Sequence, residues 1–261
     1  MEVRQIPPQD PARIIACILD IGELLLTSGA EVMRVEDTVG RLCAAYGFVK
    51  SDVFTITSDI ILTATAPDGA VITQSRRVLT RSTDLNRVER INALSRRVVA
   101  DPLPADAFRA AIERERPSIA YAPRTQFLLY GAISAVFSVF FGGDALDALA
   151  AFFSGLVLFI ALQTGSRLRI NSILLSTLCS AVTALAVVGL TACGLGHHAD
   201  KIIIGNIMLL ISGAAFFNSL RDIIAGDMMA GILRLCEAVV LAVFLAAGVA
   251  TAILLTGVMG L

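Results

Sequence analysis

Residues 148–166 read ALAAFFSGLVLFIALQTGS and contain no Lys, Arg, Asp or Glu. A helix rises about 1.5 Å per residue, so these 19 residues reach about 28 Å, close to the ~30 Å hydrocarbon core of a bilayer. Four more charge-free stretches of at least this length lie between residue 125 and the last residue, at 125–143, 170–193, 202–220 and 238–261. The sequence therefore predicts five transmembrane helices.

Charged residues separate this apolar part from the N-terminal part. Residues 1–124 hold 16 of the 21 Lys and Arg and 16 of the 22 Asp and Glu, whereas the remaining 137 residues hold only 11 charges. We therefore expect an α-helical polytopic membrane protein with an N-terminal α+β domain. The expected parts are a cytoplasmic domain at 1–116, a connector at 117–124 and a five-helix transmembrane domain at 125–261.

The N-terminal part shows both helical and strand periodicity. Apolar residues spaced for one helix face predict helices at 11–27, from Ser28 to Gly47, at 84–100 and at 104–116. Ser28 and Glu31 have the spacing of a capping box at the start of the second helix. Short β-branched runs predict strands at 53–57, 60–66 and 70–74, the last two joined by a turn at Pro67-Asp68-Gly69.

Composition and motifs argue against several classes of function. The net charge of −1 and the lack of a basic, aromatic-rich surface argue against a nucleic-acid partner. Nucleotide-binding, serine-hydrolase and zinc-protease motifs are absent, and the five cysteines lack Cys-x-x-Cys spacing, so we expect neither catalysis nor a cofactor. Arginines gather before the first span and in the second and fourth gaps, which predicts an inner-membrane protein with its N-terminus in the cytoplasm and its C-terminus outside.

The second predicted helix carries Glu31, Arg34 and Glu36 beside its apolar stripe. Glu31 and Arg34 have the spacing of an ordinary surface ion pair, as do Asp37 and Arg41 on the same helix. A solvated charged face is one interpretation. The alternative is a cytoplasmic gate that docks under the membrane domain.

Two polar groups lie in the gaps on the predicted outer side. Asp144 and Asp147 have helical spacing, and because two nearby carboxylates repel, one could hold its proton and serve proton coupling. A plain outer turn is the alternative. His197 and His198 are adjacent in the third gap, and their side chains should diverge, which favours a solvated loop over a metal site.

The fourth gap, residues 218–231, places single charges among apolar and glycine residues. If this segment is helical, Asn218, Arg221 and Asp222 share one side. Charged groups at membrane depth usually pair or line a wet path, so these three residues and Asp227 are candidates for a transport pathway. An amphipathic helix lying on the inner face of the membrane is the alternative.

Several short strings, in this order, resemble the threonine/serine exporter family. They are LLLTSGAEVMRVEDT at 24–38, DLNR at 84–87, FGGD at 141–144, IMLL at 207–210, NSLRD at 218–222 and GD at 226–227. The resemblance covers almost the whole chain and implies export of a small polar metabolite, driven by protons. Threonine and serine are the substrates in some members, and a C4-dicarboxylate in others.

The chain departs from the family at one point in the fourth span. Where the family commonly has Pro-Gly, this sequence reads Ile211-Ser212-Gly213. A proline there would break the helix and expose backbone groups to substrate. Ser212 and Gly213 are candidates for the same role, and whether the helix breaks stays open.

The resemblance also implies a partner. Family members carry a second five-span module, either on the same chain or on a short second subunit. This chain resembles the larger subunit, so we expect a short five-span partner, with a homo-oligomer as the alternative assembly. A membrane-anchored enzyme and a structural or sensory membrane protein are the competing classes of function.

Overall fold

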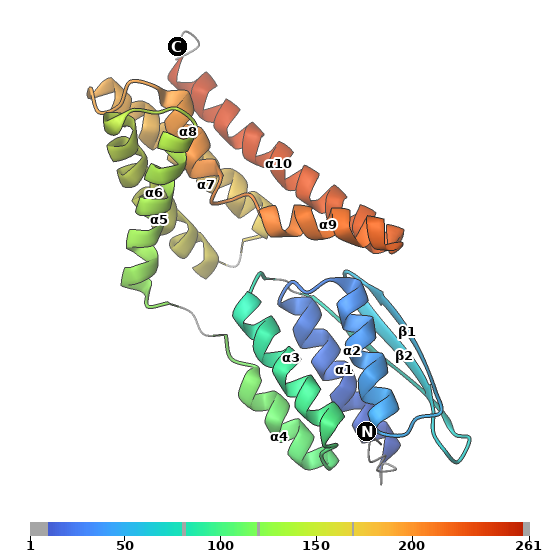
Figure 1. Ribbon diagram of the computed structural model, residues 1–261. Coiled ribbons are helices and arrows are strands. Elements are labelled where there is room, and N and C mark those ends of the chain that lie inside the picture. The colour runs from blue at the N-terminus through green and yellow to red at the C-terminus, as the bar shows by residue number, and fades with distance from the viewer. Residues whose placement is uncertain (1–9, 80–81, 119–120, 169, 258–261) are drawn as a thin grey trace. The chain divides into compact units, whose positions relative to one another are not determined.

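A computed structural model describes residues 10–79, 82–118, 121–168 and 170–257. Some residues of the predicted domains, spans and gaps lie outside the described residues. They are 1–9, 119–120, Arg169 of the second gap and 258–261. The chain divides into two compact units (Figure 1). The first comprises Met1–Ile119 with Ala214–Leu235, and the second comprises Ala120–Gly213 with Cys236–Leu261.

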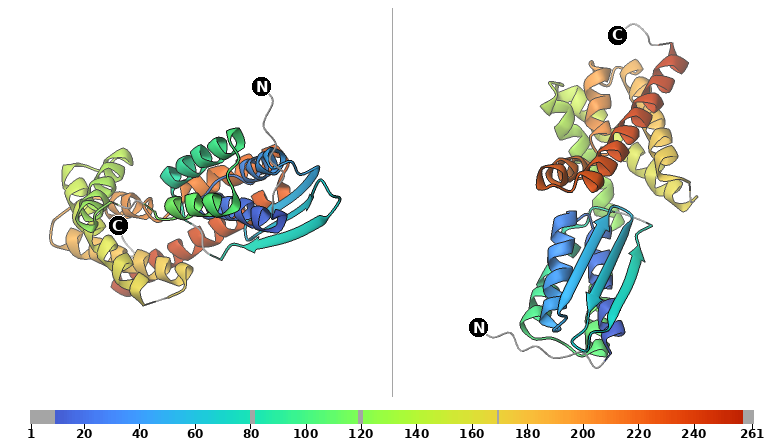
Figure 2. Two further views of the ribbon diagram at one scale, coloured as in Figure 1. Left: turned by 90° about the horizontal axis from the view of Figure 1, so that it is seen from below. Right: turned by 90° about the vertical axis from the view of Figure 1, so that its right-hand side faces the viewer.

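The first unit is an α+β structure in which helices cover one face of a three-stranded sheet (Figure 2). The strands pair antiparallel in the order β1 (Lys50–Ile56), β2 (Asp59–Thr65) and β3 (Val71–Arg77). Its N-terminal helices are α1 (Pro11–Thr27), α2 (Val32–Ala45), α3 (Leu85–Ala100) and α4 (Ala105–Glu115). Most of α9 (Gly213–Ala225) and the first residues of α10 (Met228–Thr256) also belong to this unit.

Helix α1 lies at the centre of the first unit because most of its side chains are apolar and buried. Its first turn is stabilised by Asp10, whose carboxylate accepts the Arg13 amide, and by Pro11 at the first helical position. Ile18 and Leu25 are fully buried. Because α1 contacts α2, α3, α4, β2 and β3, it fixes the positions of the elements around it.

The predicted turn at Pro67-Asp68-Gly69 is confirmed. The Asp68 carboxylate accepts the Ala70 amide at 3.0 Å, and Gly69 adopts a φ of +88°, which favours glycine. The turn sets the register of β2 and β3, in which Thr63 lies opposite Thr73.

The predicted capping box at Ser28 and Glu31 is wrong. Ser28 ends α1, and its hydroxyl donates to the Leu24 carbonyl at 2.5 Å. Gly29 then reverses the chain with a φ of +90°, and Glu31 precedes α2 without a side-chain hydrogen bond to the helix. The reason is that Gly29 provides the left-handed residue that commonly ends a helix, so Ser28 belongs to the preceding helix.

The second unit is built from helices. They are α5 (Pro123–Phe140), α6 (Ala145–Arg167), α7 (Ser172–Ala192), α8 (Ala199–Ile207) and most of α10. Three helices in the described part of the chain, α6, α7 and α10, are long and apolar enough to cross a membrane. The chain is thus mostly helical with three candidate membrane spans, and the five predicted spans are not confirmed.

The fourth predicted span, residues 202–220, is divided between two helices. Helix α8 ends at Ile207 and α9 begins at Gly213. Between them, the Leu210 amide bonds to the Ile207 carbonyl, which is turn rather than α-helical spacing. The helix therefore breaks without the proline that the family commonly has, and the nine residues of α8 reach only about 14 Å.

Small and polar residues allow α5, α6 and α8 to approach one another closely. Asn206 on α8 is buried and donates to the Ser154 hydroxyl on α6 at 2.8 Å. A Cβ added to Gly205 would lie 2.8 Å from the Ser134 carbonyl and 2.8 Å from the Ser138 amide, both on α5. Backbone contact of this kind is typical of membrane helices that associate through small residues.

Gly205→Ala should therefore destabilise the second unit, although alanine is the better helix former. The added methyl group meets backbone atoms, and overpacking of this kind typically costs about 1–3 kcal/mol. Gly189→Ala in α7 is the matched control, because nothing lies within 4 Å of its added Cβ. Thermal unfolding in detergent should show a lower midpoint for Gly205→Ala only. Equal midpoints for the two variants would contradict the close contact.

Candidate functional site

The loop between α1 and α2 contacts α9 within the first unit. The Arg221 guanidinium on α9 lies 2.7 Å from the Glu31 carboxylate. One turn earlier, the Asn218 side-chain amide donates to the Gly29 carbonyl at 3.0 Å. The shared helix side predicted for Asn218 and Arg221 therefore faces residues about 190 positions away in the sequence.

A buried ion pair lies beside this contact. Asp222 on α9 and Arg234 on α10 are only 1% and 6% exposed, and their charged groups approach to 3.2 Å. Arg234 also reaches the Ala30 carbonyl at 3.5 Å. We call Gly29, Ala30, Glu31, Asn218, Arg221, Asp222 and Arg234 the junction site.

The pKa values of two carboxyl groups at and beside the junction, Asp222 and Glu36, are raised. Burial raises the pKa of Asp222, although the nearby Arg234 opposes this, and the charge of Asp227 adds to the rise. Burial also raises the pKa of Glu36, whose carboxylate accepts the Thr55 amide at 2.8 Å. The Asp227 charge again adds to the rise, so Glu36, Asp222 and Asp227 form one electrostatic group.

The α1–α2 loop is held in place from its other side. A Cβ on Gly29 would lie 3.2 Å from the Ser82 carbonyl, and φ is positive there, so glycine is required. Arg87 on α3 donates to the Ser28 hydroxyl at 2.7 Å and to the Arg116 carbonyl at 3.2 Å. The loop is thus positioned by α3 and by the segment that follows α4.

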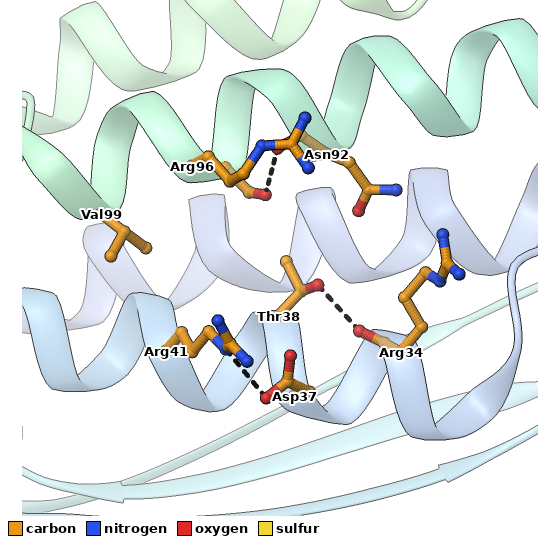
Figure 3. A pocket seen from close by; sticks show the side chains of 8 residues that line it. Arg34, Asp37, Thr38, Arg41, Asn92, Arg96 and Val99 are labelled. Atoms are coloured by element: carbon orange, nitrogen blue, oxygen red, sulfur yellow. Dashed lines mark hydrogen bonds and ion pairs between the residues drawn. The ribbon is translucent and has the colours of Figure 1, made fainter.

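The expected pairing of Glu31 with Arg34 is wrong, whereas that of Asp37 with Arg41 is confirmed at 2.9 Å. Arg34 instead lines a cavity of about 280 Å³ between α2 and α3 (Figure 3). The lining residues are Arg34, Asp37, Thr38 and Arg41 from α2, and Asn92, Ser95, Arg96 and Val99 from α3. The two predicted gate residues therefore lie at different sites: Glu31 pairs with Arg221, and Arg34 lines the cavity.

Ser212 and Gly213 lie at the break between α8 and α9, Ser212 immediately before the first residue of α9. They belong to the second unit, whereas the junction site belongs to the first. Sequence reasoning missed Arg234 and the Gly29 and Ala30 carbonyls. The sequence contained one signal for Arg234, namely a single arginine within an otherwise apolar stretch.

Asp144, Asp147 and the two histidines form a second polar cluster. Asp144 and Asp147 make a capping box at the start of α6. The side chains of His197 and His198 are 58% and 53% exposed, as expected for a solvated loop, and each also contacts a carboxylate: the His197 ring contacts Asp144 at 2.6 Å and the His198 ring contacts Asp147 at 2.8 Å. Asp147 is fully buried and also accepts both histidine backbone amides.

The same cluster brings potential metal-ligand atoms together. The ligand atoms of Asp144, Asp147 and His198 lie within 4.8 Å of one another, which a metal ion could bridge. Each of them is already hydrogen-bonded within the cluster. The hydrogen bond between His197 and Asp144 raises the pKa of the imidazole and lowers that of the carboxyl group.

The chain matches known proteins over most of its length. A family model described as "Putative threonine/serine exporter" matches residues 16–256. The chain belongs to the threonine/serine exporter family. A protein of Mycobacterium tuberculosis (strain ATCC 25618 / H37Rv), described as "Probable threonine/serine exporter", is 26% identical over 256 residues. The match covers 94% of this chain but only 46% of that protein, and no solved structure matches.

The junction site of this exporter-family chain has the chemistry to bind a charged small molecule. It combines Arg221, whose side chain is 59% exposed, with the carboxylate of Glu31. Arg221 can donate to a carboxylate, and Glu31 can accept from an ammonium group. Exchange of the Arg221–Glu31 ion pair for contacts with a ligand would leave the buried pair of Asp222 and Arg234 intact.

Proposed function

We propose that this chain exports threonine and serine from the cytoplasm, and that the junction site forms part of the pathway. A zwitterionic amino acid offers one carboxylate and one ammonium group. Arg221 and Glu31 are an accessible cation and an anion held 2.7 Å apart, so they could each take one of these groups. This mixed-charge pair is the observation that carries the proposal, together with membership of the exporter family.

Export of a C4-dicarboxylate is the second candidate. A substrate with two carboxylates would need two available cations, and Asn218 could supply further donors. Arg234 is the second cation of the junction, but it is buried against Asp222. The pairing of charges therefore supports the amino acid over the dicarboxylate.

Proton coupling is further proposed to use Asp222 of the junction site together with Glu36 and Asp227 beside it. Burial raises the pKa of Asp222 and of Glu36, so both are suited to take up a proton, and Asp227 lies close enough to influence both. Asp144 is less suited, because its hydrogen bond with His197 lowers its pKa. Asp147 already accepts four hydrogen bonds and is better explained as a structural anchor of α6.

The membrane arrangement is part of the same proposal. The distribution of arginines supports an inner-membrane protein with a cytoplasmic domain at 1–116, a connector at 117–124 and membrane helices over 125–261. Helix α5 would supply the first of the five crossings, and α8 with the first part of α9 would supply the fourth. Because α8 and α9 are separated by a break at residues 208–212, the fourth crossing would be a broken helix.

Transport is further proposed to require a second membrane module, on this or another polypeptide. The chain spans less than half the length of the curated relative that it matches, which supports such a module. Helix α10 offers a surface on which that module could pack closely, because Ala242, Ala246 and Ala250 are small, exposed and spaced one turn apart. A homo-oligomer is the competing arrangement.

Efflux from cells loaded with labelled threonine tests the function. Coexpression of the chain with a second family module should accelerate efflux of threonine more than efflux of succinate. Arg221→Gln should reduce the threonine rate at least about tenfold, as expected for loss of one charge-assisted contact. Arg167→Gln is the control, because Arg167 lies in a polar gap well separated in sequence from the junction residues. At an equal protein level this variant should export threonine at the wild-type rate.

The outcomes separate the two parts of the proposal. If the wild-type pair exports neither threonine nor serine, the function is wrong. If Arg221→Gln exports threonine at the wild-type rate, the function stands but the junction site is not its pathway.

A further inference from the structure

The cavity between α2 and α3 has an excess of positive charge. Arg34, Arg41 and Arg96 line it, and Asp37 is the only carboxylate among the lining residues. Asp37 pairs with Arg41 on the same helix at 2.9 Å. The remaining two guanidinium groups therefore carry the net charge of the cavity.

Those two arginines are available to a ligand. Within the described residues, neither Arg34 nor Arg96 makes a side-chain hydrogen bond or an ion pair. They come from different helices, and Figure 3 shows Arg34 extending from α2 toward the α3 side, where Asn92 and Arg96 lie. The hydroxyls of Thr38 and Ser95 are already bonded to backbone carbonyls of their own helices. The donors left for a ligand include the guanidinium groups of Arg34 and Arg96, the Asn92 amide and the terminal NH groups of Arg41, whose Nε is bonded to Asp37.

We infer that this cavity binds a small anion that carries two or more carboxylate or phosphate groups. Guanidinium groups bind both kinds of group through paired hydrogen bonds, and two of them on facing helices suit a ligand with two anionic ends. The volume of about 280 Å³ lies just below the range of typical ligand pockets, about 300–1,000 Å³, which suits a small ligand. Val99 contributes an apolar wall.

The site is separate from the junction site, and this inference does not rest on the proposed transport. None of the lining residues belongs to the junction. Both sites use α2, however, because Glu31 precedes that helix and Arg34 lies on its first turn. An anion bound between α2 and α3 would bridge these two helices of the first unit.

Calorimetric titration of the purified full chain in detergent with pyrophosphate, citrate and acetate tests the inference. Pyrophosphate or citrate should bind, acetate should bind at least about tenfold more weakly, and added salt should weaken binding. Arg34→Gln and Arg96→Gln should each lower the affinity about tenfold or more. Arg97→Gln is the matched control, because Arg97 is the exposed neighbour of Arg96 on α3 but does not line the cavity.

Two further experiments separate a loss of anion binding from a loss of folding and identify the bound anion. Arg34→Lys and Arg96→Lys preserve the charge but lose the paired hydrogen bonds, so they should bind more weakly while keeping the wild-type thermal midpoint. Nanodiscs of phosphatidylcholine with or without phosphatidic acid identify the source of the anion. Competition by phosphatidic acid assigns the cavity to a lipid phosphate, and no competition assigns it to a free metabolite. Absence of pyrophosphate and citrate binding, or an equal loss in Arg97→Gln, would overturn the inference.

Discussion

Reversing the charge of Glu31 or of Arg221 alone should abolish threonine efflux, and reversing both together should restore a substantial part of it. In Glu31→Lys two cations face each other at the junction, and in Arg221→Glu two anions do. The double variant recreates an ion pair in the opposite sense across the 2.7 Å contact. We expect each single variant to export at less than about a tenth of the wild-type rate, which corresponds to about 1.4 kcal/mol.

Melting temperatures show whether the loss of efflux comes from a change in stability. Arg221 is 59% exposed, and exposed ion pairs contribute about 0–1 kcal/mol, so Arg221→Glu should melt close to the wild-type value in detergent. Glu31 is only 17% exposed, so the melting temperature of Glu31→Lys is compared with that of the double variant, in which the ion pair is recreated. Failure of the double variant to export, with both single variants folded, would mean that each charge acts separately rather than as a pair. Reversal of Lys50 together with Asp52, an exposed ion pair on β1 at 2.8 Å, is the control and should leave efflux unchanged.

Arg234→Met should destabilise the first unit strongly at neutral pH. The change leaves the Asp222 carboxylate buried without its cation, and breaking a buried pair in this way costs about 3–5 kcal/mol. Arg221→Met removes an exposed arginine from the same junction and should cost no more than about 1 kcal/mol. Thermal unfolding in detergent should separate the two variants clearly.

The pH dependence of the Arg234→Met variant distinguishes charge burial from lost packing. Burial raises the pKa of Asp222 above its unfolded value, and removal of Arg234 takes away the main opposing charge. A group of this kind binds its proton more tightly in the folded state, so its stability is present at low pH and is lost as pH rises through the folded pKa. The variant should therefore regain stability as pH falls. A loss of the same size at every pH would indicate packing alone.

Sequence patterns predicted the N-terminal elements well where local signals decide the structure. The bounds of α1 agree with the prediction because an apolar face, Asp10 and Pro11 all define the same helix. The turn at Asp68-Gly69 followed from residues that favour a positive φ. The prediction of a capping box failed because the signals for the end of one helix and the start of the next overlap at Ser28-Gly29. Periodicity does not show to which of the two helices Ser28 belongs.

The candidate site was only partly predictable for a different reason. Helical spacing placed Asn218 and Arg221 on one side of a helix, but it gives no partner, and Glu31 lies 190 residues away in the sequence. Arg34, three residues after Glu31, had suitable spacing for an ion pair with Glu31, so the prediction paired Glu31 with Arg34 rather than with Arg221. Hydropathy also hid the division of the fourth stretch, because most residues at the break are as apolar as those on either side.

Threonine flux into and out of reconstituted vesicles is the most direct test of the central claim. Vesicles containing the chain and its second family module, with an imposed proton gradient, should move labelled threonine, and dissipation of the gradient should slow this movement. Arg221→Gln in the same vesicles should remove the gradient-dependent component. Absence of threonine and serine flux in the wild-type vesicles, with both proteins inserted, would contradict the account.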